Sequence, residues 1–227
     1  MIKSTNQHSN NDPVLRKLLV SVKTWYKKLI FNSSDYWEKR YINGGTSGAG
    51  SYGHLATFKA DVLNRFVTEK KVNTVIEFGF GDGNQLMLAS YPNFIGYDVS
   101  KEAVTLCRTK FANDKKKSFH HVSEWKGETA ELVLSLDVIY HLVEDHIYFT
   151  YMRNIFAASS KYVGIYSSNK SENTRNQDVH VRHRNFTEWV SENAPDWIMF
   201  YHIANIYPSA KYGIEGSFAD FFFYEKV

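Results

Sequence analysis

The residues best suited to chemistry lie where a short apolar run meets three glycines. The run over 74–78 carries Glu77 near its end, and Gly79, Gly81 and Gly83 follow at alternate positions. β-branched residues in such a run favour a buried parallel strand, and glycines let the backbone turn sharply and approach a ligand closely. An acidic strand end beside the loop suits a cationic ligand better than an anionic one. The segment therefore predicts a nucleotide-binding loop that follows a buried strand.

The glycine spacing narrows the choice of nucleotide. Dinucleotide-binding loops follow the pattern G-x-G-x-x-G, whereas this loop reads G-x-G-x-G, with Asp82 and Asn84 on either side of its last glycine. Residues 48–53 do match the longer pattern, but no strand precedes them, so this match is discounted. Residues 85–89 predict the start of a helix, whose N-terminus would direct positive potential at the loop.

A second acidic residue follows at a spacing that suits a ribose. Residues 93–99 predict a strand that ends at Asp98, 19 positions after Gly79. A carboxylate there can accept hydrogen bonds from both ribose hydroxyls. Asp98 could instead cap a helix over 101–111, although Ser100 could cap it equally well. With the glycine loop upstream, ribose binding is the favoured interpretation.

A further predicted strand, over 131–137, ends at Asp137 and is followed by Tyr140 and His141. Together with the glycine loop, this segment resembles the motifs of class I methyltransferases that use S-adenosylmethionine (SAM). The resemblance extends over about residues 70–170 and implies SAM as the cofactor. SAM contains an adenosine and an amino-acid tail but no phosphate, which agrees with the glycine spacing.

Residues 34–55 predict a cover over the site. Tyr36, Trp37 and Arg40 precede a stretch rich in glycine and serine over 42–51. Arg40 could pair with the carboxylate of the methionine tail of SAM, and either aromatic ring could pack on it. The alternative is a flexible linker beneath which Trp37 only fills the core. We favour a mobile cover, because a plain linker needs no aromatic residues before it.

The resemblance implies further contacts with SAM. The end of a predicted strand over 118–122 would approach the adenine through Glu124 or Trp125. The segment after the strand over 131–137 would line both the cofactor and the acceptor pocket. The residues that we expect to bind SAM are Tyr36, Trp37, Arg40, Glu77, Gly79, Gly81, Asp82, Gly83, Asn84, Asp98, Val99, Glu124, Trp125 and Asp137.

Methyl transfer from a sulfonium is a direct displacement, so the acceptor atom must lie in line with the methyl group. A hydroxyl acceptor benefits from a base, whereas an amine needs only its lone pair. His141 is the first candidate for the base, because it lies at the predicted carboxyl edge of the sheet. It could instead begin a helix and bond to Asp145. Tyr140 precedes it, a departure from the family that leaves the base open.

A second group of candidates is the run H-V-R-H-R. His180 and His183 are further candidate catalytic residues, and Arg182 and Arg184 could hold an anionic acceptor such as a carboxylate, sulfate or phosphate. Tyr140 joins them as a candidate substrate-binding residue. The alternative is a solvated basic turn.

Composition limits the class of protein. The chain has 227 residues, of which 43% are hydrophobic and 22% charged, as expected of a soluble α/β domain. The net charge of +3 is too small to argue for nucleic acid as a partner. Cys107 is the single cysteine, which indicates a buried thiol and a cytoplasmic protein. His141, Glu144, Asp145 and His146 do not match a metal-binding spacing, so no metal is expected.

The order of elements predicts the architecture. Strands alternate with helices, and a late strand pair follows over 197–207 and 218–227. This pattern predicts an α/β three-layer sandwich with a mostly parallel seven-stranded sheet and an antiparallel C-terminal strand pair. We assign 34–227 to the methyltransferase domain and 1–33 to a tail and a basic amphipathic helix. That helix, over 13–31, could lie on an anionic membrane surface, or pack on the domain or on a second subunit in a homodimer.

Three segments, 44–51, 135–142 and 180–184, look like those of bacterial methyltransferases with surface-glycan and secondary-metabolite functions. This narrower resemblance implies a sugar or glycan hydroxyl as acceptor. We therefore expect a SAM-dependent methyltransferase that acts on a small-molecule or glycan acceptor, in the cytoplasm or peripherally at the inner membrane face. The alternatives are methylation of an amine or phosphate on a small metabolite, and a non-catalytic SAM-binding subunit.

Overall fold

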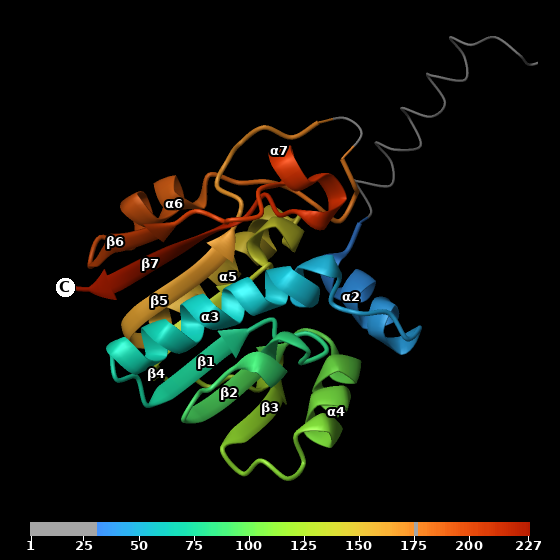
Figure 1. The fold of residues 1–227 in the computed structure, drawn as a ribbon, viewed down its shortest axis with the longest axis vertical. Coiled ribbons are helices and arrows are strands. Elements are labelled where there is room, and N and C mark those ends of the chain that lie inside the picture. Colours follow the sequence, from blue (N-terminus) through green and yellow to red (C-terminus); the bar gives the residue numbers. More distant parts are fainter. Residues whose placement is uncertain (1–30, 175–176) are drawn as a thin grey trace, which may run out of the picture. The chain divides into compact units, whose positions relative to one another are not determined.

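Seven short runs, most of them rich in apolar residues, form a single sheet (Figure 1). The computed structural model describes residues 31–174 and 177–227, so the predicted helix over 13–31 lies outside the described residues except at its last position. The strands are β1 (Thr74–Phe78), β2 (Asn93–Asp98), β3 (Lys117–His121), β4 (Ala130–Leu136), β5 (Ser159–Ser167), β6 (Trp197–Ile203) and β7 (Asp220–Lys226). Among the described residues, no helix is long and apolar enough to cross a membrane.

The strand order is β3-β2-β1-β4-β5-β7-β6, and β7 alone runs against its neighbours. The predicted mostly parallel sheet with an antiparallel C-terminal strand pair is confirmed. Glu77 of β1 pairs in register with Gly96 of β2 and Leu134 of β4, so the carboxyl ends of three strands meet at one edge. The chain passes from β1 to β2 on one side and returns to β4 on the other. Such a switch point opens a crevice for ligands.

Helices cover both faces of the sheet, which makes three layers (Figure 1). Neighbouring residues of β1 point to opposite faces, as strand geometry requires. Val75 packs in a cluster with Phe66 of α3, whereas Ile76 packs in a cluster with Met152 of α5. The helices of the described residues are α2 (Ser33–Ile42), α3 (Gly53–Glu69), α4 (Lys101–Lys110), α5 (Asp145–Ala157), α6 (Phe186–Asn193) and α7 (Ser209–Tyr212).

The segment after the glycine loop differs from the prediction. The expected helix over 85–89 is a single 3₁₀ turn, η2 (Gln85–Leu88). Pro92 follows within a few residues and β2 begins at Asn93, which leaves no room for an α-helix between the two strands. A turn this short supplies no helix dipole to the loop.

Ser100 caps α4, which settles the choice between the two candidate caps. Its Oγ accepts a hydrogen bond from the Ala103 N–H at 3.1 Å. Asp98, at the end of β2, is therefore available to the glycine loop.

Candidate functional site

The glycine loop is turned by backbone that favours glycine and is tied to β2. Gly79 has φ +90° and donates its N–H to the Tyr97 carbonyl at 2.7 Å. Gly81 has φ +59° and donates its N–H to Asp98 Oδ2 at 2.9 Å. Both conformations lie in the left-handed region that L side chains rarely adopt. The loop is thus held close to the end of β2, with its backbone exposed to the crevice.

Replacing Gly79 with alanine is expected to destabilise the fold more than replacing Gly127, which has a similar backbone. A Cβ at Gly79 would lie 2.4 Å from Val138 Cγ2, whereas a Cβ at Gly127, with φ +99°, would meet nothing within 4 Å. Backbone strain should cost each variant about 1 kcal/mol, and overpacking should cost Gly79→Ala about 2 kcal/mol more. Urea unfolding measures both changes. Equal losses in the two variants would mean that Val138 moves aside without cost.

A cavity of about 290 Å³ lies at the carboxyl ends of β1, β2 and β4. Its wall includes eight of the predicted site residues, which are Trp37, Glu77, Gly79, Gly81, Asp98, Val99, Asp137 and His141. Helices α2 and α5 close it from the sides, through Ser33 and Tyr151 among others. The three carboxyl groups in this wall make it acidic.

Glu77 is the most unusual group in the cavity. It is 4% exposed, and among the described residues its carboxyl has no hydrogen-bond partner. Burial, opposed by Lys59 and aided by the nearby Asp98 and Asp137, raises the pKa of Glu77 to about 8. A buried carboxyl without a partner is costly to ionise, and a cation placed beside it would remove that cost.

This raised pKa predicts that the protein loses stability as the pH rises. A carboxyl whose pKa is higher in the folded than in the unfolded chain stabilises the fold fully below the unfolded value, about 4.5, and that contribution is lost as the pH rises to about 8. Each pKa unit corresponds to about 1.4 kcal/mol, so the loss amounts to several kcal/mol.

Glu77→Gln keeps the shape of the side chain and cannot ionise, so it should remove this loss. We expect the variant to be more stable than the wild type at about pH 9 and similar to it near about pH 4.5. Urea unfolding at several pH values, without added ligand, measures the difference between the two proteins. Parallel pH profiles for the two proteins would show that Glu77 does not carry the effect.

Asp98 is placed to accept two hydrogen bonds from a ligand in the cavity. Its Oδ2 accepts the Gly81 N–H and its Oδ1 accepts the Ser100 N–H, both at 2.9 Å. Each carboxylate oxygen retains a second lone-pair direction for a ligand hydroxyl. Burial raises the pKa of Asp98 to about 6, and the backbone N–H groups limit that rise. Asp98 is therefore ionised at neutral pH.

His141 presents one ring nitrogen as an acceptor. It lies in the 3₁₀ turn η4 (Ile139–His141), and its Nδ1 lies 2.9 Å from the His180 carbonyl oxygen. A carbonyl only accepts, so Nδ1 carries the proton and Nε2 has a free lone pair. Burial lowers the pKa of His141 to about 4, so the ring is neutral at pH 7. The Trp37 ring lies edge-on to it at 4.8 Å.

Solved structures share this arrangement of strands and helices, although no family model and no curated protein matches the chain. The N-methyltransferase NodS from Bradyrhizobium japonicum WM9, in complex with S-adenosyl-L-homocysteine (SAH), is 13% identical with a TM-score of 0.67, over 86% of this chain and 99% of that one. Magnesium protoporphyrin IX methyltransferase (ChlM) from Synechocystis PCC 6803, with bound SAM, is 11% identical with a TM-score of 0.59, over 98% and 100%. The methyltransferase domain of bacterial CtHen1 is 18% identical with a TM-score of 0.59, over 74% and 96%.

The fold is that of the Rossmann-like methyltransferases. In this methyltransferase fold, the described cavity occupies the switch point of the sheet, where ligands of open α/β proteins bind. The identities are too low to carry over an acceptor or a reaction, so the chemistry of the site has to be argued from its own residues.

The basic run contributes mainly to structure. Arg184 donates to Asp145 Oδ1 at 2.7 Å and to the Leu142 and Val143 carbonyls, and its side chain is only 10% exposed. Arg182 donates to the Val143 carbonyl at 2.9 Å. Neither arginine lines the cavity. The expected role in binding an acceptor is thus replaced by a role in fastening the segment that follows η4, because the partly buried carbonyls there need donors.

The two other histidines differ from each other. His183 is buried, and its Nδ1 lies 2.7 Å from Ser168 Oγ, away from the cavity wall. This placement does not support the expected catalytic role. The His180 ring stacks between those of Tyr36 and His141, with centroids 4.8 and 5.3 Å away. His180 therefore positions His141 through both its ring and its carbonyl. The expected bond from His141 to Asp145 is not formed.

Tyr140 also differs from its expected role as a substrate-binding residue. It is buried, and its hydroxyl donates to Asp137 Oδ1 at 2.8 Å. It does not line the cavity. It therefore orients Asp137, which does.

The cover is fastened to the glycine loop. Ser47 donates its N–H to Asp82 Oδ2 at 2.8 Å, and its Oγ accepts the Asp82 N–H at 2.9 Å. The Tyr52 hydroxyl also donates to Asp82, and Asn84 Nδ2 donates to the Ser51 carbonyl at 2.6 Å. Asp82 and Asn84 thus hold the cover instead of contacting the cavity, and these bonds argue against a freely mobile segment.

Arg40 does not face the cavity. Its Nε donates to the Thr46 carbonyl at 2.5 Å, and its guanidinium lies over the Trp37 ring. Gly83 also stands away from the cavity, because it packs against Cys107 and Phe111 of the α4 region. Of the three cover residues expected to contact SAM, only Trp37 lines the cavity, whereas Tyr36 stacks on His180.

The expected adenine contacts also differ. Glu124 is exposed and accepts the His121 N–H at 2.9 Å, in a cap of the 3₁₀ turn η3 (Val122–Glu124). Trp125 donates to the Glu128 carbonyl at 3.0 Å. Val122 lines the cavity in their place. The turn directs the polar side chains outward, so the apolar residue at its start faces inward.

Lys59 is the most important residue that sequence reasoning missed. It lies on α3, is 1% exposed, and its Nζ lies 2.5 Å from Asp137 Oδ2. The signal was available, because Lys59 stands between Leu55 and Leu63, one helical turn from each, on an apolar stripe. The other missed residues of the cavity wall include Ser33, Ser34, Tyr41, Ser47, Ser51, Phe78, Phe80, Gln85, Tyr97, Val122, Leu142, Thr150, Tyr151 and Asn154.

Proposed function

We propose that the protein is a SAM-dependent methyltransferase that transfers a methyl group in line to a hydroxyl of a sugar, glycan or similar polar acceptor. The observation that carries the proposal is the unpartnered, buried carboxyl of Glu77 in an acidic cavity beside the glycine loop. SAM carries a sulfonium and an ammonium, and both would be stabilised by such a wall. The same wall would not stabilise an anionic dinucleotide.

The other residues of the wall fit the remaining parts of SAM. Asp98 has lone pairs available for two ribose hydroxyls, and Val99 and Val122 offer an apolar surface to the adenine. Gly79 and Gly81 bring their backbone to the cavity without a Cβ. SAM supplies the methyl group, and the chain holds and aligns it.

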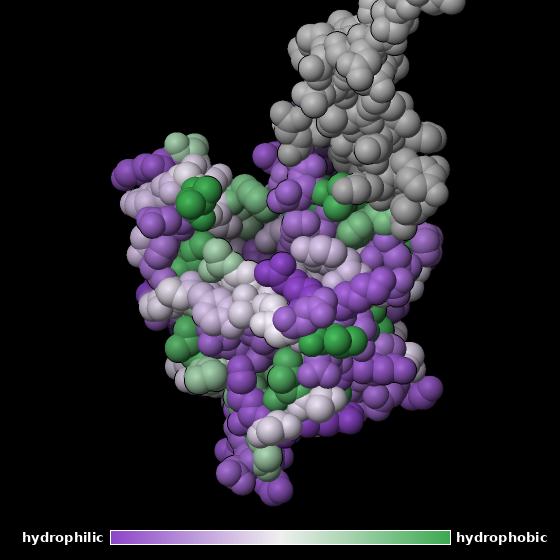
Figure 2. All heavy atoms as spheres, turned by 90° about the vertical axis from the view of Figure 1, so that its right-hand side faces the viewer, coloured by the Kyte–Doolittle hydropathy of each residue, from purple (hydrophilic) through white to green (hydrophobic). Residues whose placement is uncertain are grey.

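The state of His141 supports a hydroxyl acceptor. Its Nε2 lone pair can take the hydroxyl proton as the oxygen bonds to the methyl carbon and the carbon–sulfur bond breaks. An amine would not need such a base. Figure 2 shows one side of the molecule, and the described residues visible there are mainly hydrophilic, which suits a polar acceptor. The Trp37 ring lies beside His141 in the cavity wall, where its apolar surface can contact a sugar.

Calorimetric titration with SAM and SAH tests the donor. We expect both to bind, and NAD and ATP to bind far more weakly, because the wall is acidic. Failure to bind SAM and SAH would overturn the proposal.

Transfer of isotope from methyl-labelled SAM into candidate glycan and metabolite extracts tests the acceptor. A methyl ether in the labelled product supports the hydroxyl assignment. A methylated amine or phosphate in the labelled product would show that the acceptor is not a hydroxyl.

A further inference from the structure

Helix α3 contributes to the cavity wall a lysine whose hydrogen-bonding capacity is only partly used. Asp137 is the one hydrogen-bond acceptor recorded for Lys59 Nζ among the described residues, and the Tyr166 ring lies 5.2 Å from it. An ammonium has three donors, so Lys59 can donate to a further acceptor in the cavity. Lys59 is also the one lysine or arginine among the residues that line the cavity.

Gln85, which bonds to the helix that carries Lys59, supplies an unused acceptor to the cavity wall. Its Nε2 donates to the Ala56 carbonyl of α3 at 3.0 Å, which fixes the orientation of the amide. Its Oε1 is buried and has no hydrogen-bond partner among the described residues. Gln85 lines the cavity together with Glu77, whose carboxyl also lacks a partner. A buried acceptor without a donor is costly, so this part of the wall is suited to a ligand with N–H groups.

One cationic donor and two acceptors form the complement of an α-amino acid. A carboxylate can accept from Lys59, and an ammonium can donate to Glu77 and Gln85. The position of Lys59 Nζ is fixed by Asp137, whose other oxygen accepts the Tyr140 hydroxyl at 2.8 Å. Asp137 itself has φ +59°, an uncommon backbone for a residue other than glycine, which indicates that its placement matters.

We propose that Lys59 binds the carboxylate of the amino-acid tail of SAM, and that Gln85 and Glu77 accept hydrogen bonds from its ammonium. The inference rests on the proposed function, and it assigns to Lys59 the role that the sequence indicates for Arg40. Lys59 acts as a positioning residue, since it holds the end of the cofactor remote from the methyl group.

The test compares SAH with its decarboxylated analogue, which lacks only the carboxylate. In the wild type we expect the analogue to bind roughly 10- to 150-fold more weakly, the loss expected for one charge-assisted hydrogen bond. In Lys59→Met the two ligands should bind about equally, because the partner of the carboxylate is gone. Calorimetry measures both affinities without any need for turnover.

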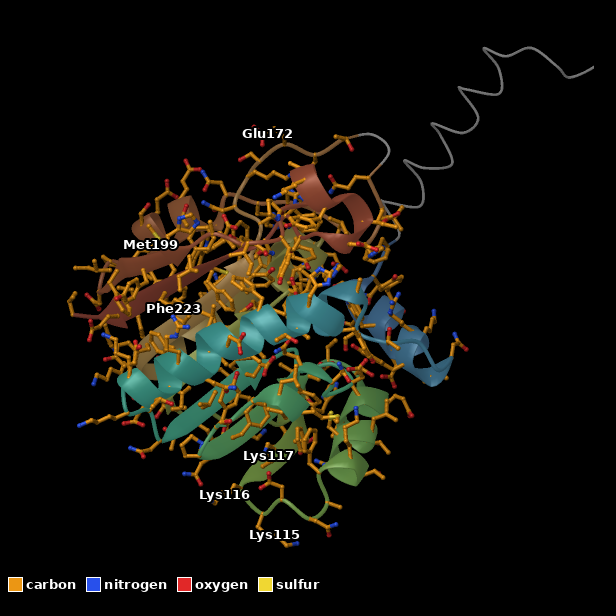
Figure 3. The ribbon with its side chains drawn as sticks, in the orientation of Figure 1. Lys115, Lys116, Lys117, Glu172, Met199 and Phe223 are labelled. Atoms are coloured by element: carbon orange, nitrogen blue, oxygen red, sulfur yellow. The ribbon has the colours of Figure 1, made fainter. Side chains whose placement is uncertain are left out.

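Controls separate this role from general damage to the cavity. Lys59→Met/Asp137→Asn removes both members of the ion pair, so no unpaired carboxylate remains if the single variant folds poorly. Lys116→Met alters an exposed lysine in the loop before β3 (Figure 3) and should leave both affinities unchanged.

The outcomes of this test distinguish failure of the Lys59 assignment from failure of the proposed function. If the wild type binds neither ligand, the proposed function itself fails. If it binds both equally, or binds the analogue more tightly as an acidic wall alone would dictate, Lys59 does not hold the carboxylate. If Lys59→Met retains the wild-type preference for SAH, another group holds it.

Discussion

Replacing Asp98 with alanine is expected to lower the affinity for SAM by roughly 10²- to 10⁴-fold. The change removes two charge-assisted hydrogen bonds to the ribose, and each is worth about 1.5–3 kcal/mol. It also leaves the Gly81 and Ser100 N–H groups without their acceptor. Calorimetric titration measures the loss. Binding should also weaken as the pH falls through about 6, because the carboxyl then takes up a proton.

Two variants check that the loss arises at the ribose. Asp98→Asn retains one acceptor oxygen and should lose less affinity than Asp98→Ala. Asp114→Ala removes a carboxylate from the turn before β3 and should leave SAM binding unchanged. Unaltered SAM affinity in a folded Asp98→Ala protein would show that Asp98 does not bind the ribose.

Replacing His141 with alanine is expected to lower kcat by about 10²- to 10⁴-fold, the usual contribution of a general base, and to change SAM affinity little. The assay is transfer of labelled methyl to the acceptor that isotope transfer identifies. In the wild type, kcat should fall as the pH drops through about 4, because protonation of Nε2 removes the base.

Two results would remove His141 from this role. One is unchanged turnover in His141→Ala with retained SAM affinity. The other is an equal loss in His202→Ala, an exposed histidine of β6 that bonds to Asp220. A methylated amine as product would remove the need for a base and would predict a small effect of His141→Ala.

The fold could be predicted from the sequence because its signals are local. Short apolar runs between turn residues mark the strands, and the carboxyl ends of parallel strands lie at one edge. Glu77, Gly79, Gly81, Asp98, Asp137 and His141 line the cavity because each lies at or just after a strand end. The same argument fails for the segment after the loop, where the nearness of Pro92 to the glycines outweighs helix propensity.

The rest of the site depends on contacts between distant segments. Arg184 donates to carbonyls about forty positions earlier in the chain. Arg40 donates to the Thr46 carbonyl and packs on the Trp37 ring, so neither arginine faces the cavity. Lys59 reaches the cavity only because α3 crosses the sheet above β4 (Figure 1). The two arginines are predicted to bind a ligand from their charge alone, whereas Lys59 lines the cavity because of how α3 packs on the sheet.

The raised pKa of Glu77 has a consequence for how the protein captures a cation. At pH 7 this carboxyl carries a proton, because its pKa is about 8. A cationic ligand lowers that pKa, so binding near neutral pH releases the proton to the solvent. The measured binding enthalpy should then depend on the ionisation enthalpy of the buffer, and affinity should rise with pH until Glu77 is ionised beforehand. Capture of the cofactor is thus an exchange of one cation, the proton, for another.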